Sequence, residues 1–529
     1  MSEGEPISIS GVHRPPALRR VAVALVAGVL CLLAVLTATG LLVGRPVGAG
    51  DNGDGSRLYC GVGLVPATPD RNSNWKGGVV MRFDRDARCS DPMPSSAEPI
   101  LRAAAYGSGS GWSLTRLGWL YALLAAAATA LAAFAATGAG LARALVLLPI
   151  LVPLAEPDFA RFFLSTYSEP AGLLGAFVLV CGVAVIAVTG RVHRAERLIG
   201  LVLVAGGGLL ATTAKAAYAP LLVTAFVVCA VVAVAVRRGG PRWSDRLVGP
   251  VIGVLAVVAV IAPLSAALSW QSRGYPGVNA YDLTFTTVLT EIPDATTALG
   301  LPGSAAEHAG DSYYLTPAPQ DVPGAAIVLA DPTRAQHTDW QQLAEHPAAL
   351  LRSVGVAMEA TEGRGLAYLP SAEWTPSTTP VKLGTIYGEQ GASGPTLRAW
   401  LDGLTFPWWP AVLAALGVAV GIAGTIRRTR LWSSCARLAG VTALSAVGLA
   451  TFAVLGDGYF EIAKHTWLAA YLLDVTALAL LGALVTAATQ AVRSARIRRH
   501  QPTATAGMVG VLASMPAESA ASVGQPDTR

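Results

Sequence analysis

Charged residues are scarce in this chain of 529 residues: they make up 13% of it, against 53% for hydrophobic residues. Soluble globular domains carry about 25% charged residues, so this composition excludes a single soluble globular domain and favours a membrane protein. Several catalytic signatures are missing as well. There is no Gly-x-Ser-x-Gly elbow and no His and Cys set with zinc-ligand spacing, and the Gly-Ser repeat at 107–111 lacks the context of a phosphate-binding loop.

Cysteine is also rare, with six residues in the whole chain. Four of them lie in or beside apolar segments, whereas Cys60 and Cys89 share one polar stretch. If that stretch is outside the cell, its environment permits a disulfide. A bridge would stabilise the loop by about 3 to 4 kcal/mol in the chain-entropy model. Two unpaired small residues are the alternative.

Long apolar segments dominate what is present. Those long enough to cross about 30 Å of hydrocarbon lie near 21–44, 114–136, 138–155, 170–190, 198–214, 219–236, 247–269, 406–426, 438–456 and 465–490. The first exceeds a signal-peptide core of about 7 to 15 residues, so we expect a retained helix. Pro149 and Pro153 predict a kinked or re-entrant third segment. The predicted fold class is an all-α integral membrane protein with about ten transmembrane helices and a small mixed extracytoplasmic domain.

The arginines give the orientation of these segments. Clusters at 191–197, 237–246, 427–437 and 493–499 each follow an even number of spans, and the positive-inside rule then places both termini in the cytoplasm. The predicted protein is a multi-pass protein of the cell membrane, in contact with membrane lipids. Because the basic residues flank apolar segments and form no continuous face, nucleic acid is not expected as a partner.

This orientation divides the chain into regions, as follows: a cytoplasmic tail at 1–17, helices one to seven at 18–269 with a first outer loop at 45–113, an extracytoplasmic domain at 270–405, helices eight to ten at 406–490, and a disordered cytoplasmic tail at 491–529. Within the outer domain, apolar residues recur at helical spacing from Leu343 to Met358. They predict one helix from Asp339 to Glu362.

The first outer loop carries unusual polar residues directly after the first span. Asp51, Asp54 and Arg57 lie in the run Asp-Asn-Gly-Asp-Gly-Ser-Arg. Glycines beside Asp54 let the backbone turn tightly and approach a ligand, and an arginine can bind a phosphate bidentately. The alternatives are a solvated turn and a calcium-like loop that lacks enough oxygen ligands.

Other charges gather at the outer ends of later spans. Asp158 and Glu169 precede the fourth span, where Glu169 either caps a helix or contacts a ligand. Lys215 interrupts an apolar stretch and either serves an internal path or extends its amine to the interface.

The last outer loop contributes three more charged or titratable residues, Glu461, Lys464 and His465. The cation and the imidazole suit an anionic headgroup or a pyrophosphate, or else they anchor the interface. We therefore predict one site assembled from the first, second, third and last outer loops.

Several short fragments, in this order, resemble the bacterial glycan-biosynthesis hexose transferase family of the GT-C class: Asn52-Gly53-Asp54 with Arg57 and Gly61-Val62-Gly63-Leu64, Tyr167-Ser168-Glu169-Pro170, Asn279-Ala280-Tyr281, Leu299-Gly300-Leu301-Pro302, His346-Pro347, and Glu461 with Lys464-His465 and Asp474. The chain departs from the family's pattern at Gly55 and at Thr466-Trp467.

The resemblance implies an inverting hexosyltransferase, which moves a sugar from a polyprenyl-phosphate donor to a lipid-linked or surface glycan acceptor. It implies that Asp54 is the general base, with Asp51 or Asp158 in reserve, and that Arg57, Lys215, Lys464 and His465 face the leaving phosphate. No cofactor is assigned, and a divalent cation is left open. A lipid or glycan transporter that uses Lys215 and Asp474, and a non-catalytic scaffold for envelope assembly, are the competing hypotheses.

Overall fold

The computed structural model describes residues 16–107, 109, 111–191, 193–235, 244–315, 317–362, 369–381, 397–404, 406–426 and 431–500. Most of the N-terminal tail, the tail beyond residue 500 and the arginines at 237–242 and 427–430 lie outside these residues. The chain divides into two compact units, Met1–Ala483 and Leu484–Arg529. Of the second unit the structure describes residues 484–500, which belong to one helix.

Eight helices among the described residues are long and apolar enough to cross a membrane. They are α1 (Ala17–Ala38), α4 (Thr115–Thr137), α7 (Glu169–Val188), α8 (Arg194–Ala214), α10 (Val248–Gly274), α18 (Trp409–Ile426), α19 (Leu431–Asp457) and α20 (Ile462–His500). Each coincides with one of the predicted segments, which confirms the all-α membrane class. The last helix extends past residue 490, where the disordered tail was expected to begin.

Two of the predicted spans form only short helices. The third consists of the 3-10 helix η3 (Leu141–Leu147) and α5 (Leu148–Leu154), which contains Pro153. The sixth, α9 (Ala219–Val231), has 13 residues. At a rise of 1.5 Å per residue such a helix is about 20 Å long, less than the hydrocarbon thickness. Proline explains why the third span is irregular, since it removes a backbone donor and disturbs the preceding helical turn.

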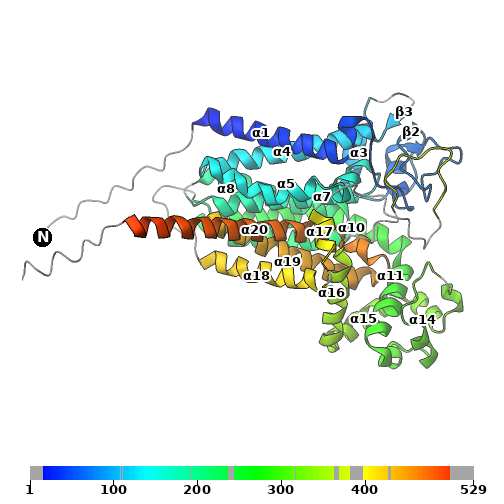
Figure 1. Cartoon of the computed structure of the whole chain (residues 1–529). Helices are drawn as coiled ribbons and strands as arrows, with labels where there is room; N and C mark the ends of the chain where they lie inside the picture. The colour runs from blue at the N-terminus through cyan, green and yellow to red at the C-terminus, as the bar shows by residue number, and fades with distance from the viewer. Residues whose placement is uncertain are drawn as a thin grey trace, which may run out of the picture. The chain divides into compact units, whose positions relative to one another are not determined.

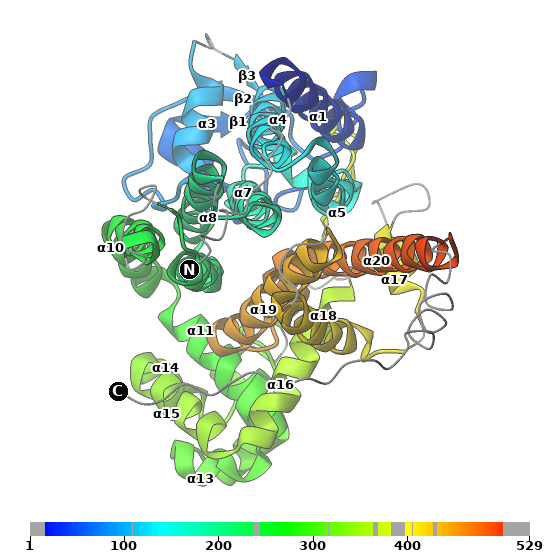
Figure 2. The same ribbon diagram turned by 90° about the vertical axis from the view of Figure 1, so that its left-hand side faces the viewer.

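Helix α7 is the centre of the bundle. It contacts α4, α8 and α19 and is enclosed by its neighbours in the view along the helices (Figure 2). Glycine makes the closest of these contacts possible. A Cβ at Gly207 of α8 would lie 2.3 Å from the Leu179 nitrogen, and one at Gly175 of α7 would lie 2.5 Å from the Ala211 nitrogen. Small residues thus let the two backbones approach, as is common between membrane helices.

The first loop, residues 45–113, contains the described strands. Strands β1 (Leu64–Pro66), β2 (Arg82–Arg85) and β3 (Gly111–Ser113) form an antiparallel sheet in the order β1-β2-β3. The helices α2 (Ser56–Tyr59) and α3 (Ala97–Ala105) accompany it. Phe83 lies between Tyr59 and Trp112, with ring centroids 5.5 and 5.4 Å away. The loop therefore has an aromatic core of its own beside the helix bundle.

Residues 276–362, which we call the helical region, pack around a second core. Its helices are α11 (Pro276–Asp282), a π-helix (Leu283–Val288), α12 (Leu289–Glu291), α13 (Thr296–Leu299), α14 (Ala325–Ala330), α15 (Pro332–Glu345) and α16 (Pro347–Glu359). The prediction of one helix from Asp339 to Glu362 is wrong, because α15 ends before His346 and α16 begins at Pro347. Proline disfavours helical geometry in the preceding residue and fits the first turn of a new helix.

Both polar regions lie at one end of the spans. The first loop and the helical region are on the right in Figure 1, beyond the ends of the long helices. Segment 369–381 connects to the first loop through backbone hydrogen bonds, such as Gly50 N–H to Pro370 O at 2.8 Å and Gly48 N–H to Ser371 O at 3.0 Å.

The remaining short helices are η1 (Leu41–Val43), η2 (Cys60–Val62), α6 (Pro157–Ala160), η4 (Arg161–Leu164), η5 (Ala216–Tyr218), η6 (Ser244–Arg246), η8 (Pro293–Ala295), η9 (Gly303–His308), η10 (Pro319–Asp321), η11 (Ala360–Glu362) and α17 (Leu397–Asp402).

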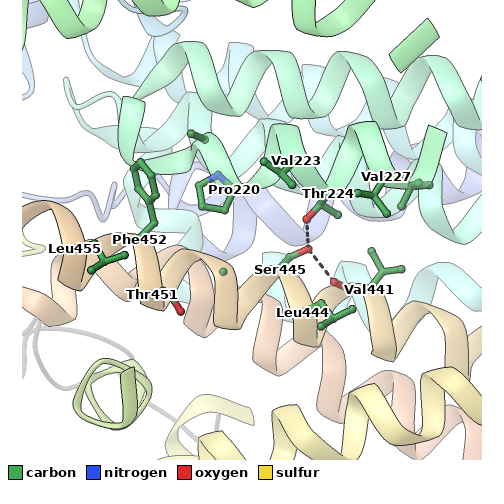
Figure 3. Close-up of a pocket in the computed structure, with 13 residues that line it drawn as sticks. Pro220, Val223, Thr224, Val227, Val441, Leu444, Ser445, Thr451, Phe452 and Leu455 are labelled. Atoms are coloured by element: carbon green, nitrogen blue, oxygen red, sulfur yellow. Dashed lines mark hydrogen bonds between the residues drawn. The ribbon is translucent and has the colours of Figure 1, made fainter. Parts of the chain in front are cut away.

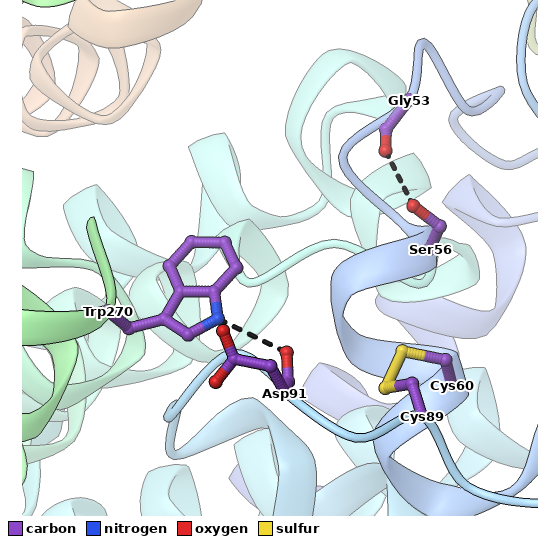
Figure 4. The surroundings of a disulfide bond; sticks show 6 residues. All are labelled: Gly53, Ser56, Cys60, Cys89, Asp91 and Trp270. Atoms are coloured by element: carbon purple, nitrogen blue, oxygen red, sulfur yellow. Dashed lines mark hydrogen bonds between the residues drawn. A yellow bond between two sulfur atoms is a disulfide. The ribbon is translucent and has the colours of Figure 1, made fainter. Parts of the chain in front are cut away.

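A disulfide closes the first loop between Cys60 and Cys89, 29 residues apart (Figure 4). In the same view the Trp270 indole N–H donates to the Asp91 carbonyl at 3.2 Å, so the end of α10 packs near the bridged segment. The other four cysteines are buried and free.

We expect the C60S/C89S double variant to lose about 3 to 4 kcal/mol of stability, because the unfolded loop regains its entropy. Thermal unfolding in detergent with and without reductant measures this. Wild type should shift to lower temperature on reduction, and the variant should not respond to reductant. An identical response of the two proteins would show that the bridge does not form.

Candidate functional site

A cavity of about 170 Å³ lies at the end of the spans that carries the polar regions. Helices α8, α10 and α19 end there, and α20 begins there, because successive spans run in opposite directions. Residues far apart in sequence therefore meet at one place. Among the predicted site residues, those lining the cavity are Asp54, Arg57, Lys215, Glu461, Lys464 and His465.

Lys464 links the last helix to the first loop. Its Nζ lies 2.5 Å from Asp54 Oδ2, 3.3 Å from Asn52 Oδ1 and 3.4 Å from Glu461 Oε2. The lysine side chain is only 4% exposed, so these oxygens replace the water that an ammonium group needs. The turn before it is strained, since Glu461 has a left-handed backbone with φ of 45°. Such conformations cost energy and cluster at functional sites.

Arg57 holds the other oxygen of Asp54. Its guanidinium lies 3.0 Å from Asp54 Oδ1, with Arg57 in the first turn of α2 and Asp54 two residues before that helix begins. The same guanidinium stacks over the Tyr275 ring at 4.4 Å and near the Trp270 ring at 5.9 Å. The aromatic rings stabilise the cation by their quadrupoles.

Asp54 is therefore a carboxylate between two cations. Burial by itself would raise its pKa, but the charges of Lys464, Arg57 and Lys215 together lower the pKa of Asp54 well below the usual range. Asp54 is ionised at any pH near neutrality. Gly55 follows it because a Cβ there would lie 2.3 Å from Thr166 Oγ1 and 2.6 Å from Asp51 Oδ2, which accounts for the small residue at this position.

Tyr167 fixes the turn that carries Asp54. Its buried hydroxyl lies 2.7 Å from the Gly50 carbonyl and accepts the Asn52 backbone N–H at 2.8 Å. The Asn52 side chain in turn donates to Glu461 Oε1 at 3.3 Å. The second and last loops thus hold the first loop from two sides.

Two further pairs complete the electrostatics of the site. Lys215 Nζ lies 3.0 Å from Glu169 Oε1, and Glu169 is 3% exposed, so the lysine neutralises a buried carboxylate besides lining the cavity. His465 Nδ1 lies 3.1 Å from Asp457 Oδ2, and both of these residues line the cavity. Glu169 also begins α7, in agreement with the helix-start alternative.

Asp51 and Asp158, the reserve bases, do not line the cavity. Asp51 Oδ1 accepts the N–H groups of Gly53 and Gly55 at 2.8 and 2.9 Å, and Oδ2 accepts the Ser73 hydroxyl at 2.6 Å. Burial raises the pKa of Asp51 against these hydrogen bonds. The Asp158 carbonyl accepts the Trp467 indole N–H at 3.4 Å. The structure therefore gives Asp51 the role of shaping the loop and places neither carboxylate at the cavity.

The sequence analysis missed the contribution of the end of α10 and of the segment that follows it. Trp270, Tyr275, Asn279 and Asp282 all line the cavity, together with Tyr314 from a later loop. The sequence signal near this segment was the fragment Asn279-Ala280-Tyr281, one of those that resemble the hexose transferase family.

No cluster of three or more His, Cys, Asp or Glu side chains suited to a metal ion occurs in the described ranges. At the cavity Asp54 and Glu461 already contact Lys464. A divalent cation, which the sequence left open, thus has no defined set of ligands among these residues.

We expect Lys464→Met to destabilise the protein by about 3 kcal/mol, because it leaves Asp54 with one cation and Glu461 with none at this contact. Lys76→Met is the matched control. It breaks the more exposed pair with Asp70, whose carboxylate is 53% exposed, and should cost about 0 to 1 kcal/mol.

The measurement is thermal unfolding in detergent as a function of pH. Since the pKa of Asp54 is lowered, its ion pairs stabilise the fold above the ordinary aspartate pKa of about 4 and lose this effect as the pH falls further. The difference between Lys464→Met and wild type should shrink in acid. Equal costs for the two variants at neutral pH would contradict a buried pair.

Comparison with known proteins identifies the family to which the chain belongs. Residues 14–328 match the model of the YfdI N-terminal transmembrane domain. This range includes α1 to α10, the first loop, Lys215 and Asp282, and it ends before Lys464. No curated protein and no solved structure shows a significant match to the chain. Because the match spans more than half of the sequence, the chain belongs to the family of membrane proteins that carry the YfdI N-terminal transmembrane domain.

Proposed function

We propose that this protein is a membrane hexosyltransferase, which transfers a sugar from a polyprenyl-phosphate donor to a cell-surface glycan on the extracytoplasmic side. The observation that carries the proposal is the position of a cavity with three Lys or Arg side chains among its lining residues, beside an apolar groove. Arg57, Lys215 and Lys464 line the cavity and suit a phosphate, while the groove suits an apolar chain of isoprene units.

The groove lies between α9 and α19 and has a volume of about 480 Å³ (Figure 3). Its lining is almost entirely apolar, with exposed Val223 and Leu444 on opposite helices. The Thr224 and Ser445 hydroxyls share a hydrogen bond of 3.0 Å across it. These two polar groups are thus satisfied by each other and by backbone, as Ser445 also donates to the Val441 carbonyl.

Sequence neighbours connect the groove with the cavity. Ala219 and Leu455 line the groove, whereas Ala216 and Asp457 line the cavity, and each pair is separated by less than one helical turn. A second apolar cavity of about 400 Å³, between α19 and the helical region, shares Phe452 and Leu455 with the groove. An amphiphile with its tail in the groove would present its phosphate to the cations.

The charges of the cavity supply the chemistry of an inverting transfer. The acceptor oxygen attacks the anomeric carbon, the bond from that carbon to the phosphate oxygen breaks, and the phosphate leaves with the electron pair. Phosphate contacts with Lys464 and Arg57 would compete with Asp54 for the same cations, which frees the Asp54 carboxylate to take the proton of the acceptor hydroxyl. The cations then stabilise the departing phosphate.

The transporter hypothesis gains no support from the cavity. Lys215 pairs with Glu169, and Asp474 is fully buried in α20 without lining the cavity or the groove. We therefore retain the transferase as the proposed function.

We expect Asp54→Asn to lower sugar transfer from a polyprenyl-phosphate donor by about 10²-fold or more, because an amide cannot accept the proton. Purified protein in detergent, incubated with a panel of such donors, provides the assay. Asp86→Asn is the matched control, since Asp86 lies in the same loop and pairs with Arg71 at the surface. Unimpaired transfer by folded Asp54→Asn would remove Asp54 from the mechanism. Absence of any sugar transfer by wild type would favour a transporter or a scaffold.

We expect Val223→Trp to raise the KM for long-chain prenyl donors by about tenfold, since the indole fills the groove and about 1.4 kcal/mol of apolar contact is lost. Donors with short prenyl chains should be affected less. Val251→Trp is the control, because Val251 is similarly exposed on α10 and does not line the groove. Equal effects of both substitutions on long and short donors would contradict a tail site in this groove.

A further inference from the structure

Asp282 is one of four carboxyl groups that line the cavity, and unlike Asp54 it forms no ion pair with a Lys, Arg or His side chain among the described residues. It is the last residue of α11, is 2% exposed and lines the cavity together with Asp457, Glu461 and Tyr314. Its Oδ1 accepts the Tyr313 backbone N–H at 2.8 Å. Its Oδ2 makes no hydrogen bond within the part of the chain that the structure describes, so that oxygen is available to carry a proton.

The backbone around Asp282 is unusual in the same place. The π-helix Leu283–Val288 starts directly after it, and the Asp282 carbonyl accepts the Thr286 hydroxyl at 2.5 Å. The Thr286 oxygen also accepts the Tyr459 N–H at 2.8 Å, which ties this turn to the loop before α20. π-helical turns are rare and often occur at functional sites, because the extra residue redirects the side chains around it.

We propose that Asp282 is the general acid of the reaction, which gives its proton to the leaving phosphate while Asp54 receives the proton of the acceptor. This inference rests on the proposed transferase function. The bond between the anomeric carbon and the phosphate oxygen breaks, its electron pair stays on the phosphate, and the phosphate takes the Asp282 proton. One proton enters at Asp54 and one leaves from Asp282, and exchange with water restores both groups.

The surroundings of the two carboxyl groups favour these opposite roles. Burial, and then the negative charges of Asp457 and Glu461, raise the pKa of Asp282 to about 7, although the Tyr313 N–H opposes the shift. The cations near Asp54 lower the pKa of Asp54 instead. Two carboxyl groups whose environments push their pKa values apart form a natural acid and base pair.

Other titratable groups face Asp282 as well. Besides Asp457 and Glu461, they are Tyr281, which precedes it on α11, and Tyr314. Asp457 in turn lies beside His465. Burial raises the pKa of both tyrosines above their ordinary value near 10, so they stay neutral in the range where Asp282 titrates.

The test is the pH profile of sugar transfer by wild type, Asp282→Asn and Asp282→Glu. An acid must be protonated to act, so wild-type kcat/KM should be constant at low pH and fall about tenfold per pH unit above about 7. No matching acidic limb should appear above pH 5, since Asp54 stays ionised. Asparagine keeps the acceptor for Tyr313 N–H but has no proton to give. The Asp282→Asn variant should be about 10²-fold slower at pH 6, lack the basic limb and approach wild type near pH 9. The Asp282→Glu variant should keep a basic limb.

Asp339→Asn is the matched control. Asp339 is a fully buried carboxyl on α15 that accepts the Thr284 hydroxyl at 2.8 Å, and burial also raises the pKa of Asp339 to about 7, yet it does not line the cavity. This variant should keep the wild-type rate and the basic limb. Loss of the limb in Asp339→Asn would assign it to a folding effect and overturn the proposal.

The outcomes separate this inference from the proposed function. Absence of sugar transfer by wild type at every pH would rule out the proposed transferase function itself. Transfer by wild type with a flat profile from pH 6 to 9 leaves the transferase standing and overturns the role of Asp282, even if Asp282→Asn fails to fold. A basic limb that persists in folded Asp282→Asn does the same.

Discussion

The ion pair between Lys464 and Asp54 joins two parts of the site that are far apart in the sequence, the last helix and the first loop. An ammonium group that is 4% exposed must find its ligands in the protein, and Asp54, Asn52 and Glu461 provide them. The first loop therefore has to lie against the start of α20. Tyr167 and segment 369–381 hold the same loop from other sides. Removing the lysine would leave carboxylates without enough water or counterions.

The bundle provides a second constraint, because it decides where this ion pair can form. Helix α7 is enclosed by α4, α8 and α19, and glycines bring α7 and α8 into backbone contact. The start of α7 and the end of α8 consequently place Glu169 and Lys215 within 3.0 Å. The apolar groove lies between α9 and α19, and its lining residue Ala219 follows Lys215 by four residues. The close packing of small residues between α7 and α8 therefore determines where the charges of Glu169 and Lys215 lie.

The cavity contains both cations and carboxylates, and Lys464 and Arg57 are each paired with Asp54. Asp54 shields Lys464 and Arg57 from each other. A phosphate would take over that role and release Asp54, at little net change in charge. Asp282 lies outside this exchange, since its neighbours Asp457 and Glu461 are themselves acidic. In the proposed reaction, a bound phosphate would free the Asp54 carboxylate, while Asp282 would keep its proton until the transfer.

Much of the fold and of the candidate site could be predicted from the sequence. Apolar length predicted the eight long spans, because a membrane demands it, and the spacing of Cys60 and Cys89 within one polar loop indicated their bridge. Ends of alternate spans must meet on one side, so the gathering of Asp54, Lys215 and Lys464 also followed from the sequence. Pro149 and Pro153 predicted an irregular third span, and the same proline rule would have divided the predicted helix at Pro347.

The sequence by itself thus determined the class of protein, its spans and most charges of the site, because these depend on local composition and on alternation. Only the tertiary structure decided what each charge does. It turned Asp51 into a hydrogen-bond acceptor for its own loop and brought Asp282 to the cavity, and it formed the groove beside α9. Those outcomes depend on which groups of distant segments approach within a few ångström. Hydrogen bonding, burial and pKa follow from that approach, and no local pattern encodes it.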